Sequence, residues 1–259
     1  MDDYFSLENQ NRFMSVSQYK KFARCPAAAM AELSGEWKPP MTQALLSGQY
    51  VDAYVEGRLE EFIDEHPEMI STRGQTAGHL KAEYRALNTL IDRFESDPVF
   101  VQYLAGEKQQ VIAAEIDGVM WRGKVDILHP KRIVDFKTVR DFNTLWSADE
   151  QRRVTPVEFW GWDIQGAVYQ ELVRKLTGER LPFYLAVVTK QDVPDIAILH
   201  VPDDVLEIKL QEVKFFAEGF QAIKKGEAPA TRCEKCEYCR LTKKLTGPVD
   251  YRFFGGVYE

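Results

Sequence analysis

The chain has 259 residues, of which 45% are hydrophobic and 12% aromatic, enough to bury the core of one domain. Its formal net charge is −7, with 40 acidic and 33 basic residues. That balance excludes a protein that coats nucleic acid along its whole surface, but local basic groups are sufficient to hold a phosphate backbone. No signal peptide is visible, and no apolar run approaches the roughly 18 residues of a membrane span, so we expect a cytoplasmic protein.

The predicted elements run in the order helices, three strands, helix, two strands, helix. Helical periodicity marks four segments: 42–65, 77–95, 156–176 and 203–225. Strand patterns mark five: 111–116, 125–128, 133–137, 181–190 and 195–202. This order predicts an α/β fold with one central mixed β-sheet flanked by helices.

Two neighbouring strand patterns carry acids. Asp126 lies in the run 125–128, and Asp135 lies with Lys137 in the run 133–137. Both runs are otherwise β-branched and apolar, where acids are uncommon. The residues at 129–132, His-Pro-Lys-Arg, are typical of a turn. The two runs therefore predict a β-hairpin that brings Asp126 and Asp135 close together.

These charges favour a metal site. Two neighbouring carboxylates repel each other unless a cation lies between them, and Mg²⁺ or Mn²⁺ suits oxygen ligands. The carbonyl of Phe136 can supply another oxygen. Lys137 shares a face with Asp135 and can orient or help to deprotonate an attacking water. The alternative is a pair of strand-end acids in salt bridges with Lys137 and Lys124; the apolar surroundings of both acids favour the metal site.

This pattern resembles the PD-(D/E)XK nuclease superfamily, and within it the RecB-like and exodeoxyribonuclease VIII-like (RecE-like) phage exonucleases. The resemblance rests on Asp126, on Asp135-Phe136-Lys137, and on Gln165 and Tyr169, a Q-x-x-x-Y pair on the helix after the hairpin. It implies a restriction-endonuclease-like core. Without the hairpin, Gln165 and Tyr169 would be read as a polar pair on one helix face.

More weakly, the resemblance covers nearly the whole chain. It implies a single nuclease domain over 1–259, with a mainly helical part at 1–107, a catalytic αβ core at 108–200, and a C-terminal helix with a cysteine-rich tail at 201–259.

Two further acids match the family less closely. Gly48 and Asp52 resemble a G-x-x-x-H motif, with Asp52 where the family usually has a metal-binding histidine. An aspartate can also bind Mg²⁺, and the competing interpretation is an exposed helical acid. Glu115 matches another acid common in the family, and its alternative is a charge at a strand edge.

The four cysteines form one N-terminal and one C-terminal group. Cys233, Cys236 and Cys239 have the C-x₂-C-x₂-C spacing of ferredoxin-type clusters, and Cys25 is the remaining cysteine. The resemblance to RecB-like nucleases, including CRISPR-adaptation ones, implies that these four hold a [4Fe-4S] cluster. The spacing here is tighter than in those relatives, so structural Zn²⁺ and metal-free thiols stay open. Either metal would fasten the C-terminal tail to the first helix.

The functional hypothesis is a Mg²⁺-dependent DNA exonuclease that resects double-stranded ends for phage-type single-strand annealing recombination. Asp126 and Asp135 would bind the metal, Lys137 would position or activate the water, and Gln165 and Tyr169 would support the substrate side. The resemblance implies 5′-to-3′ polarity, an annealing protein as partner, and the bacterial host cytoplasm as location. A homo-oligomeric ring is a further arrangement to test.

Two alternatives remain: a CRISPR-adaptation-like iron–sulfur nuclease acting on single-stranded DNA, and a non-catalytic DNA-binding module of the same fold.

Several side chains are candidates for contact with DNA. The basic ones are Lys20, Lys21, Arg24, Arg152, Arg153, Lys243 and Lys244. Such pairs are more often solvated surface than DNA contacts. Trp146, Trp160 and Trp162 can stack on splayed bases, although tryptophans at this spacing are more often part of a core.

Overall fold

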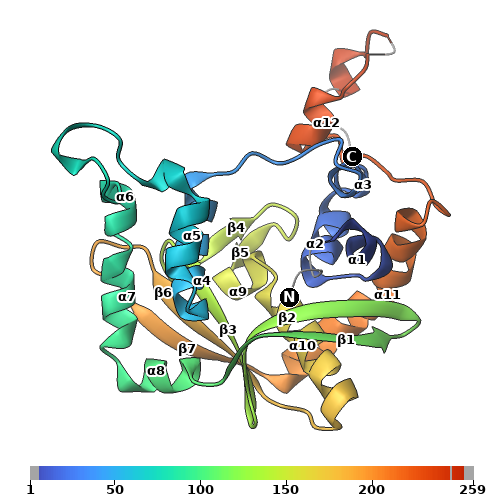
Figure 1. The fold of residues 1–259 in the computed structure, drawn as a ribbon. Coiled ribbons are helices and arrows are strands. Elements are labelled where there is room, and N and C mark those ends of the chain that lie inside the picture. The colour runs from blue at the N-terminus through green and yellow to red at the C-terminus, as the bar shows by residue number, and fades with distance from the viewer. Residues whose placement is uncertain (1–5, 246, 254–259) are drawn as a thin grey trace.

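A computed structural model describes residues 6–245 and 247–253 of the chain (Figure 1). Its centre is a five-stranded sheet in the order β1-β2-β3-β6-β7. The strands are β1 (Glu107–Ile116), β2 (Val119–His129), β3 (Arg132–Val139), β6 (Phe183–Thr189) and β7 (Ile196–Val201). β3 and β6 are parallel and the other neighbours antiparallel. The predicted α/β fold with a mixed sheet is confirmed.

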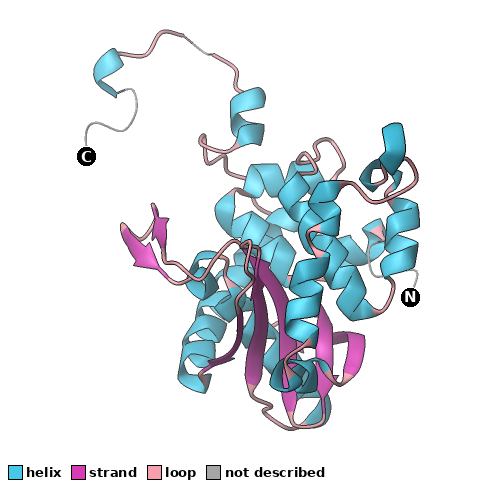
Figure 2. Ribbon diagram, turned by 90° about the vertical axis from the view of Figure 1, so that its left-hand side faces the viewer, coloured by secondary structure: helices cyan, strands magenta, loops and turns pink. Residues whose placement is uncertain are grey.

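The chain between the parallel strands β3 and β6 crosses over the sheet, as parallel pairing requires. It forms β4 (Leu145–Ser147), β5 (Arg152–Val154), α9 (Pro156–Phe159) and α10 (Trp162–Thr177). β4 and β5 make a separate antiparallel hairpin that projects from the body of the molecule (Figure 2). The sequence predicted one helix over 156–176. The structure has two, because Gly161 between them adopts a left-handed conformation with φ +61°.

Each face of the sheet is covered by helices that bury a separate core. α2 (Val16–Arg24), α10 and α11 (Asp203–Lys224) pack on one face. α4 (Gln43–Glu56), α7 (Asn88–Glu95) and α8 (Pro98–Leu104) pack on the other. β3 serves both cores, since its side chains alternate: Ile133 joins the first core and Phe136 the second.

α10 lies very close to the sheet. A Cβ atom on Gly166 would come within 2.5 Å of the Phe183 ring, so only glycine fits there without displacing the helix. This close approach lets the side chains of the first turns of α10 reach β2 and β3.

The remaining helices are short: α1 (Leu7–Arg12), α3 (Pro26–Leu33), α5 (Leu59–Glu65), α6 (Ala82–Arg85), α12 (Glu237–Leu241), and the 3₁₀ turns η1 (Pro67–Met69), η2 (Gly74–Thr76) and η3 (Tyr251–Phe253). The helix predicted over 42–65 is two helices, because Gly57 ends α4 with a left-handed C-cap at φ +79°. The segment 77–95 begins as helix only at Ala82 and is divided into α6 and α7. Among the described residues, no helix combines the length and the apolar character needed to cross a membrane.

Candidate active site

β2 and β3 separate at the two aspartates. Their described ladder ends at the pair Ile127 and Val134, and the next residues along the strands are Asp126 and Asp135. From there β2 continues beside β1 and β3 beside β6. The Asp126 carboxylate fills the fork, where its Oδ2 accepts a hydrogen bond from the Phe136 backbone N–H at 3.1 Å. The fork places both acids at one point between the two sheet halves.

Gln109 on β1 faces Asp126 from the other side. The β1–β2 ladder pairs the residues before and after Gln109, and Gln109 itself has a positive φ of 55°. Its Nε2 donates to Asp126 Oδ1 at 3.4 Å, a long hydrogen bond. A non-glycine residue in this conformation costs free energy and is often retained at functional sites. No pattern in the sequence points to Gln109.

Asp135 is held from two directions. It is fully buried, with 0% of its surface exposed. Its Oδ1 accepts a hydrogen bond from Gln165 Nε2 on α10 at 2.7 Å, and its Oδ2 lies 2.5 Å from Lys137 Nζ. Oδ2 is buried and makes this ion pair without a described hydrogen-bond partner of its own, and a carboxylate oxygen has two lone pairs, so it can accept a further ligand.

Lys137 is a cation in this environment. Burial alone would lower its pKa, but the carboxylates of Asp135 and Asp126 outweigh burial and raise the pKa of Lys137 to about 12. At neutral pH the side chain is therefore an ammonium. It can donate hydrogen bonds to a water or a phosphate oxygen, and accepting a proton from water would first require loss of its own.

Asp52 lies on α4, which packs on the face of the sheet opposite to α10 and Gln165. A Cβ on Gly48, one turn earlier on α4, would lie 3.5 Å from Thr138 Oγ1, so this part of α4 packs directly on β3. Burial, with repulsion from Asp126, raises the pKa of Asp52 to about 7. Burial and Asp135 likewise raise the pKa of Asp126. Lys137 lowers both pKa values but does not offset burial and the mutual repulsion of the acids, so a further cation would favour their ionised forms.

The donor set fits Mg²⁺ bound partly through water. Among the described residues, only the four cysteines discussed below bring three or more ligand atoms close enough to enclose a metal ion directly. The carboxylate oxygens of Asp52, Asp126 and Asp135 do not form such a closed group. Mg²⁺ retains several waters and usually takes one or two carboxylates directly. Asp126 and Asp135 suit direct contact, and Asp52 suits contact through a water.

We expect the effect of Mg²⁺ on stability to depend on pH. Divalent metal must displace protons from Asp52, whose pKa is raised to about 7, and from Asp126, whose pKa is also raised. The increase in Tm caused by Mg²⁺ should therefore be small near pH 5.5 and grow through about pH 8.

Without metal the dependence is reversed. A carboxyl with a raised folded pKa contributes stability that is complete below its unfolded pKa of about 4 and is lost as pH rises through the folded value. Thermal unfolding in EDTA and in Mg²⁺ across this range measures both trends. Asp52→Asn should flatten them, and a Mg²⁺ effect that is independent of pH would contradict the assignment.

Gln165 and Tyr169 both contact the protein frame of the site. Gln165 fixes Asp135, as described above. The Tyr169 hydroxyl donates to the Lys124 carbonyl at 3.0 Å. Its ring lies against Gly123 so closely that a Cβ atom on Gly123 would be 2.8 Å from Tyr169 Cε1. These contacts fix the segment of β2 that leads to Asp126. The geometry thus supports positioning roles, and contact of either residue with substrate stays a prediction.

Glu115 does not join the group. It lies on β1 opposite Met120, near the far end of the β1–β2 hairpin, and is exposed to solvent. Asp126 lies opposite Gln109, six residues away along β1, so the strand geometry separates Glu115 from the fork. The position supports the strand-edge charge that the sequence left as an alternative.

Two charged residues near the site were missed. Glu56 lies one turn after Asp52 on α4, contributes to the raised pKa of Asp52, and its Oε1 lies 3.9 Å from Lys124 Nζ. The i, i+4 spacing could have identified it. Lys190 follows β6, and its Nζ donates to the Ala44 carbonyl at 3.2 Å. Nothing in the local sequence marks Lys190.

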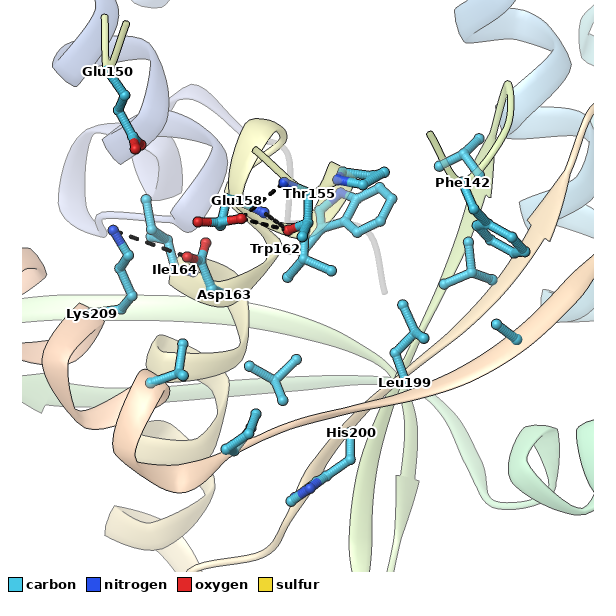
Figure 3. Close-up of a pocket in the computed structure, with 18 of the residues that line it drawn as sticks. Phe142, Glu150, Thr155, Glu158, Trp162, Asp163, Ile164, Leu199, His200 and Lys209 are labelled. Carbon is cyan, nitrogen blue, oxygen red and sulfur yellow. Dashed lines mark hydrogen bonds and ion pairs between the residues drawn. The ribbon is translucent and has the colours of Figure 1, made fainter. Parts of the chain in front are cut away.

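A cleft of about 810 Å³ lies beside the fork and is lined by Lys137 and Asp52, with Asp126 and Asp135 behind its lining. Its lining includes Lys20, Asp52, Lys137, Trp160 and Lys190. A larger hollow of about 1110 Å³ shares Pro156 and Trp162 with it (Figure 3).

The acids of the larger hollow already have partners. Asp163 lies 4.0 Å from Lys209, and Glu158 closes a capping box with Thr155 (Figure 3). We therefore place the candidate active site in the smaller cleft.

The comparisons with known proteins agree with this geometry. A sequence profile described as "PDDEXK-like domain of unknown function (DUF3799)" matches residues 15–242. The chain belongs to this family. It is also similar to the crystal structure of a protein from Eubacterium rectale named "Putative exonuclease", with 38% identity and a TM-score of 0.92 over 98% of this chain and 97% of that one. No curated protein matches the chain. The predicted membership of the PD-(D/E)XK superfamily is confirmed.

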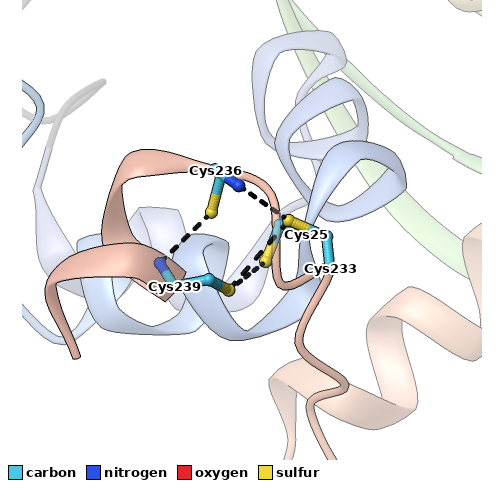
Figure 4. Close-up of side chains that lie close together, drawn as sticks. All are labelled: Cys25, Cys233, Cys236 and Cys239. Atoms are coloured by element: carbon cyan, nitrogen blue, oxygen red, sulfur yellow. Dashed lines mark hydrogen bonds between the residues drawn. The ribbon is translucent and has the colours of Figure 1, made fainter. Parts of the chain in front are cut away.

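The four cysteines of this PDDEXK-like protein meet at one point (Figure 4). Cys25 lies between α2 and α3, Cys233 precedes α12, Cys236 is the N-cap of α12, and Cys239 lies within it. All four sulfurs are within 4.8 Å of one another. The Sγ atoms of Cys25 and Cys239 are 3.6 Å apart, and those of Cys233 and Cys239 are 4.0 Å apart. The structure thus brings the N-terminal cysteine to the C-terminal three.

The local backbone favours a thiolate at Cys233. Burial opposes ionisation, but backbone N–H groups, including that of Cys236 at 3.3 Å from Sγ, lower the pKa of Cys233 to about 6. Burial raises the pKa of Cys25 and raises that of Cys236 to about 12, so a metal, which requires thiolates, would have to displace protons from these two. A tetrahedral ion with bonds of about 2.3 Å places its sulfurs about 3.8 Å apart. The two separations given above, 3.6 and 4.0 Å, are close to that value, and the other pairs lie within 4.8 Å.

Proposed function

We propose that this protein is a divalent-metal-dependent DNA exonuclease. The observation that carries the proposal is the fork between β2 and β3, where Asp126 and Asp135 meet and Lys137 Nζ lies 2.5 Å from Asp135. Membership of a PDDEXK-like family supports a nuclease. The printed name of the Eubacterium rectale protein supports exonuclease activity in particular.

Each residue of the fork has a part in this proposal. Asp126 and Asp135 hold Mg²⁺ or Mn²⁺, with Asp52 reaching it through water and the Phe136 carbonyl as a further oxygen. When bound, the metal supplies Lewis acidity toward the scissile phosphate and toward water. The Lys137 ammonium donates hydrogen bonds to the attacking water or a phosphate oxygen, where negative charge increases during hydrolysis. Gln165 keeps Asp135 in place.

The substrate we propose is the end of linear double-stranded DNA, resected for single-strand annealing recombination of the phage type. An annealing protein is the corresponding partner. The second candidate is a nuclease that acts on single-stranded DNA. The observation favouring it is the meeting of Cys25 with the three C-terminal cysteines, which matches the cysteine pattern that the chain shares with CRISPR-adaptation-like nucleases.

We further propose that the cysteine group holds a structural metal. The sulfur separations favour a single tetrahedral ion such as Zn²⁺. A [4Fe-4S] cluster places four irons between the thiolates, so it would require the sulfurs to move apart.

One experiment tests the activity and separates the candidates. The protein is incubated with end-labelled linear duplex, with the same duplex as a covalently closed circle, and with linear single strand, each in Mg²⁺ and in EDTA. We expect nucleotide release from linear duplex in Mg²⁺ alone, with the circle intact. Preferential release from single strand would favour the second candidate. Absence of cleavage in Mg²⁺ and in Mn²⁺ would refute nuclease activity, and cutting of the circle would refute an exonuclease.

A further inference from the structure

Trp160 is an exposed aromatic residue beside the candidate active site. It lines the same cleft as Asp52 and Lys137 and is 49% exposed. Trp162, two residues later, is buried at 6%. Trp146 is exposed, but it lies on the projecting β4–β5 hairpin. Of the three tryptophans considered for base stacking, Trp160 alone combines exposure with a place in the cleft.

The backbone around Trp160 is held firmly. Its N–H donates to the Pro156 carbonyl at 3.1 Å, which closes the single turn of α9. A capping box between Thr155 and Glu158 fixes the start of that turn. The Phe159 ring stands edge-on to the indole, with ring centroids 4.9 Å apart. The indole is therefore positioned before any ligand arrives, which lowers the entropic cost of stacking on it.

Lys20 provides a positive charge at the same place. Its Nζ donates to the Trp160 carbonyl at 3.0 Å, and its side chain lines the cleft. No ion pair found among the described residues includes Lys20. The neighbouring Lys21, in contrast, is paired with Glu32 and does not line the cleft. Lys20 thus presents an ammonium without a carboxylate partner next to an exposed indole.

The electrostatic setting agrees with an anionic ligand. Burial, together with repulsion from Lys137, lowers the pKa of Lys20 to about 8, although Asp135 and Asp163 act in the opposite direction. A phosphate oxygen next to Lys20 would stabilise its ammonium form, because no carboxylate of the described residues forms an ion pair with it.

We propose that Trp160 and Lys20 form a subsite for one unpaired nucleotide of a DNA strand, with the base stacked on the indole and the phosphate paired with the ammonium. The inference rests on the proposed function, because it concerns the strand that enters the catalytic cleft. Proteins that hold single strands combine cationic grooves with aromatic stacking surfaces in this way. Bases inside a duplex have both faces covered, so the subsite selects a strand whose bases are splayed apart.

Equilibrium binding of a fluorescein-labelled oligothymidylate in Ca²⁺, used in place of Mg²⁺ so that binding is measured rather than cleavage, tests the subsite. Trp160→Ala should weaken binding about 5- to 150-fold, the usual range for one stacked base. Trp160→Phe should retain most of the affinity. Lys20→Ala should weaken binding. It should also reduce the magnitude of the slope of log K against log salt concentration by about 1, which corresponds to the loss of one phosphate contact.

Two matched variants serve as controls. Lys21→Ala removes the adjacent charge outside the cleft. Phe215→Ala removes an 80% exposed aromatic on α11. Both should bind as wild type does. Thermal unfolding of every variant checks the fold, and Trp160→Phe keeps the test valid if Trp160→Ala is unstable.

In Mg²⁺, Trp160→Ala and Lys20→Ala should raise the KM for cleavage of single-stranded DNA by a larger factor than they lower kcat. Both variants should lose less affinity for blunt duplex than for single-stranded DNA. If wild type binds and cuts DNA while these variants bind oligothymidylate within twofold of it, the subsite is refuted and the nuclease proposal stands. An equal loss of affinity for blunt duplex also refutes it, because the ligand is then not an unpaired strand. If wild type binds no DNA, both proposals fail.

Discussion

Replacing Asp135 by asparagine is expected to lower kcat for Mg²⁺-dependent DNA cleavage by about a thousandfold or more. Asp135 is fully buried between the Gln165 amide and the Lys137 ammonium. Asparagine keeps the shape but removes the charge, so the site loses a proposed metal ligand and Lys137 loses its partner. Lys137→Gln should have an effect of similar size, because it removes the donor that we propose for the water or the phosphate.

The measurement is nucleotide release from end-labelled duplex at saturating Mg²⁺, with Tm to check folding. Glu115→Gln is the matched control. It neutralises a carboxylate on the strand that pairs with β2, but one that is exposed and remote from the fork. The sequence match to the family would give Glu115 a ligand role, whereas its position in the structure predicts full activity. Wild-type rates in Asp135→Asn, or loss of activity in Glu115→Gln, would show that the site is wrongly placed.

The central hairpin was predictable because alternation in a strand is a local property. The turn at 129–132 and the apolar runs on either side determine which residues share a face. The fork itself was not predictable. It arises because β2 ends its pairing with β3 at Ile127 and Val134 and follows β1 instead, a choice made by the packing of the whole sheet. Gln109 acquires its position from the same event.

Helical phase could have ranked two of the basic candidates. Lys20 and Lys21 were predicted together as possible DNA contacts, but α2 buries Val16, Tyr19 and Phe22. At 100° per residue Lys20 flanks that face and Lys21 points away, so helical phase alone separates them. The glycines that divide the predicted helices at 57 and 161 were also visible in the sequence.

The projecting hairpin was harder to predict. β4 and β5 have three residues each. A run that short is below the length at which alternation can be told from chance.

Loss of the cysteine-bound metal is expected to release the C-terminal tail while leaving the catalytic cleft intact. Cys25 and Cys239 are buried. The tail also contacts this region through a hydrogen bond from Ala27 N–H to the Thr231 carbonyl at 3.0 Å and through the Tyr238 ring, whose centroid lies 5.7 Å from that of Trp37. Binding free energy at a structural metal is folding free energy. Cys239→Ser should therefore lower Tm by about 5–10 °C, equivalent to a loss of roughly 2–3 kcal/mol in a domain of this size.

The same variant should make the chain after α11 sensitive to protease and reduce bound metal well below one equivalent. Elemental analysis of the wild-type protein should find about one zinc per chain if the sulfur spacing reflects the bound state. About four irons with visible absorption would instead show that the thiolates separate around a cluster.

Tyr238→Phe is the matched control. Tyr238 lies in α12 beside Cys239, and the substitution keeps the ring that packs on Trp37. The Tyr238→Phe variant should bind as much metal as the wild-type protein and unfold at the same Tm. Metal-free wild-type protein with the same Tm as Cys239→Ser would mean that the four thiols are simply packed together, and that the Ala27 hydrogen bond and the Tyr238–Trp37 packing are enough to hold the tail.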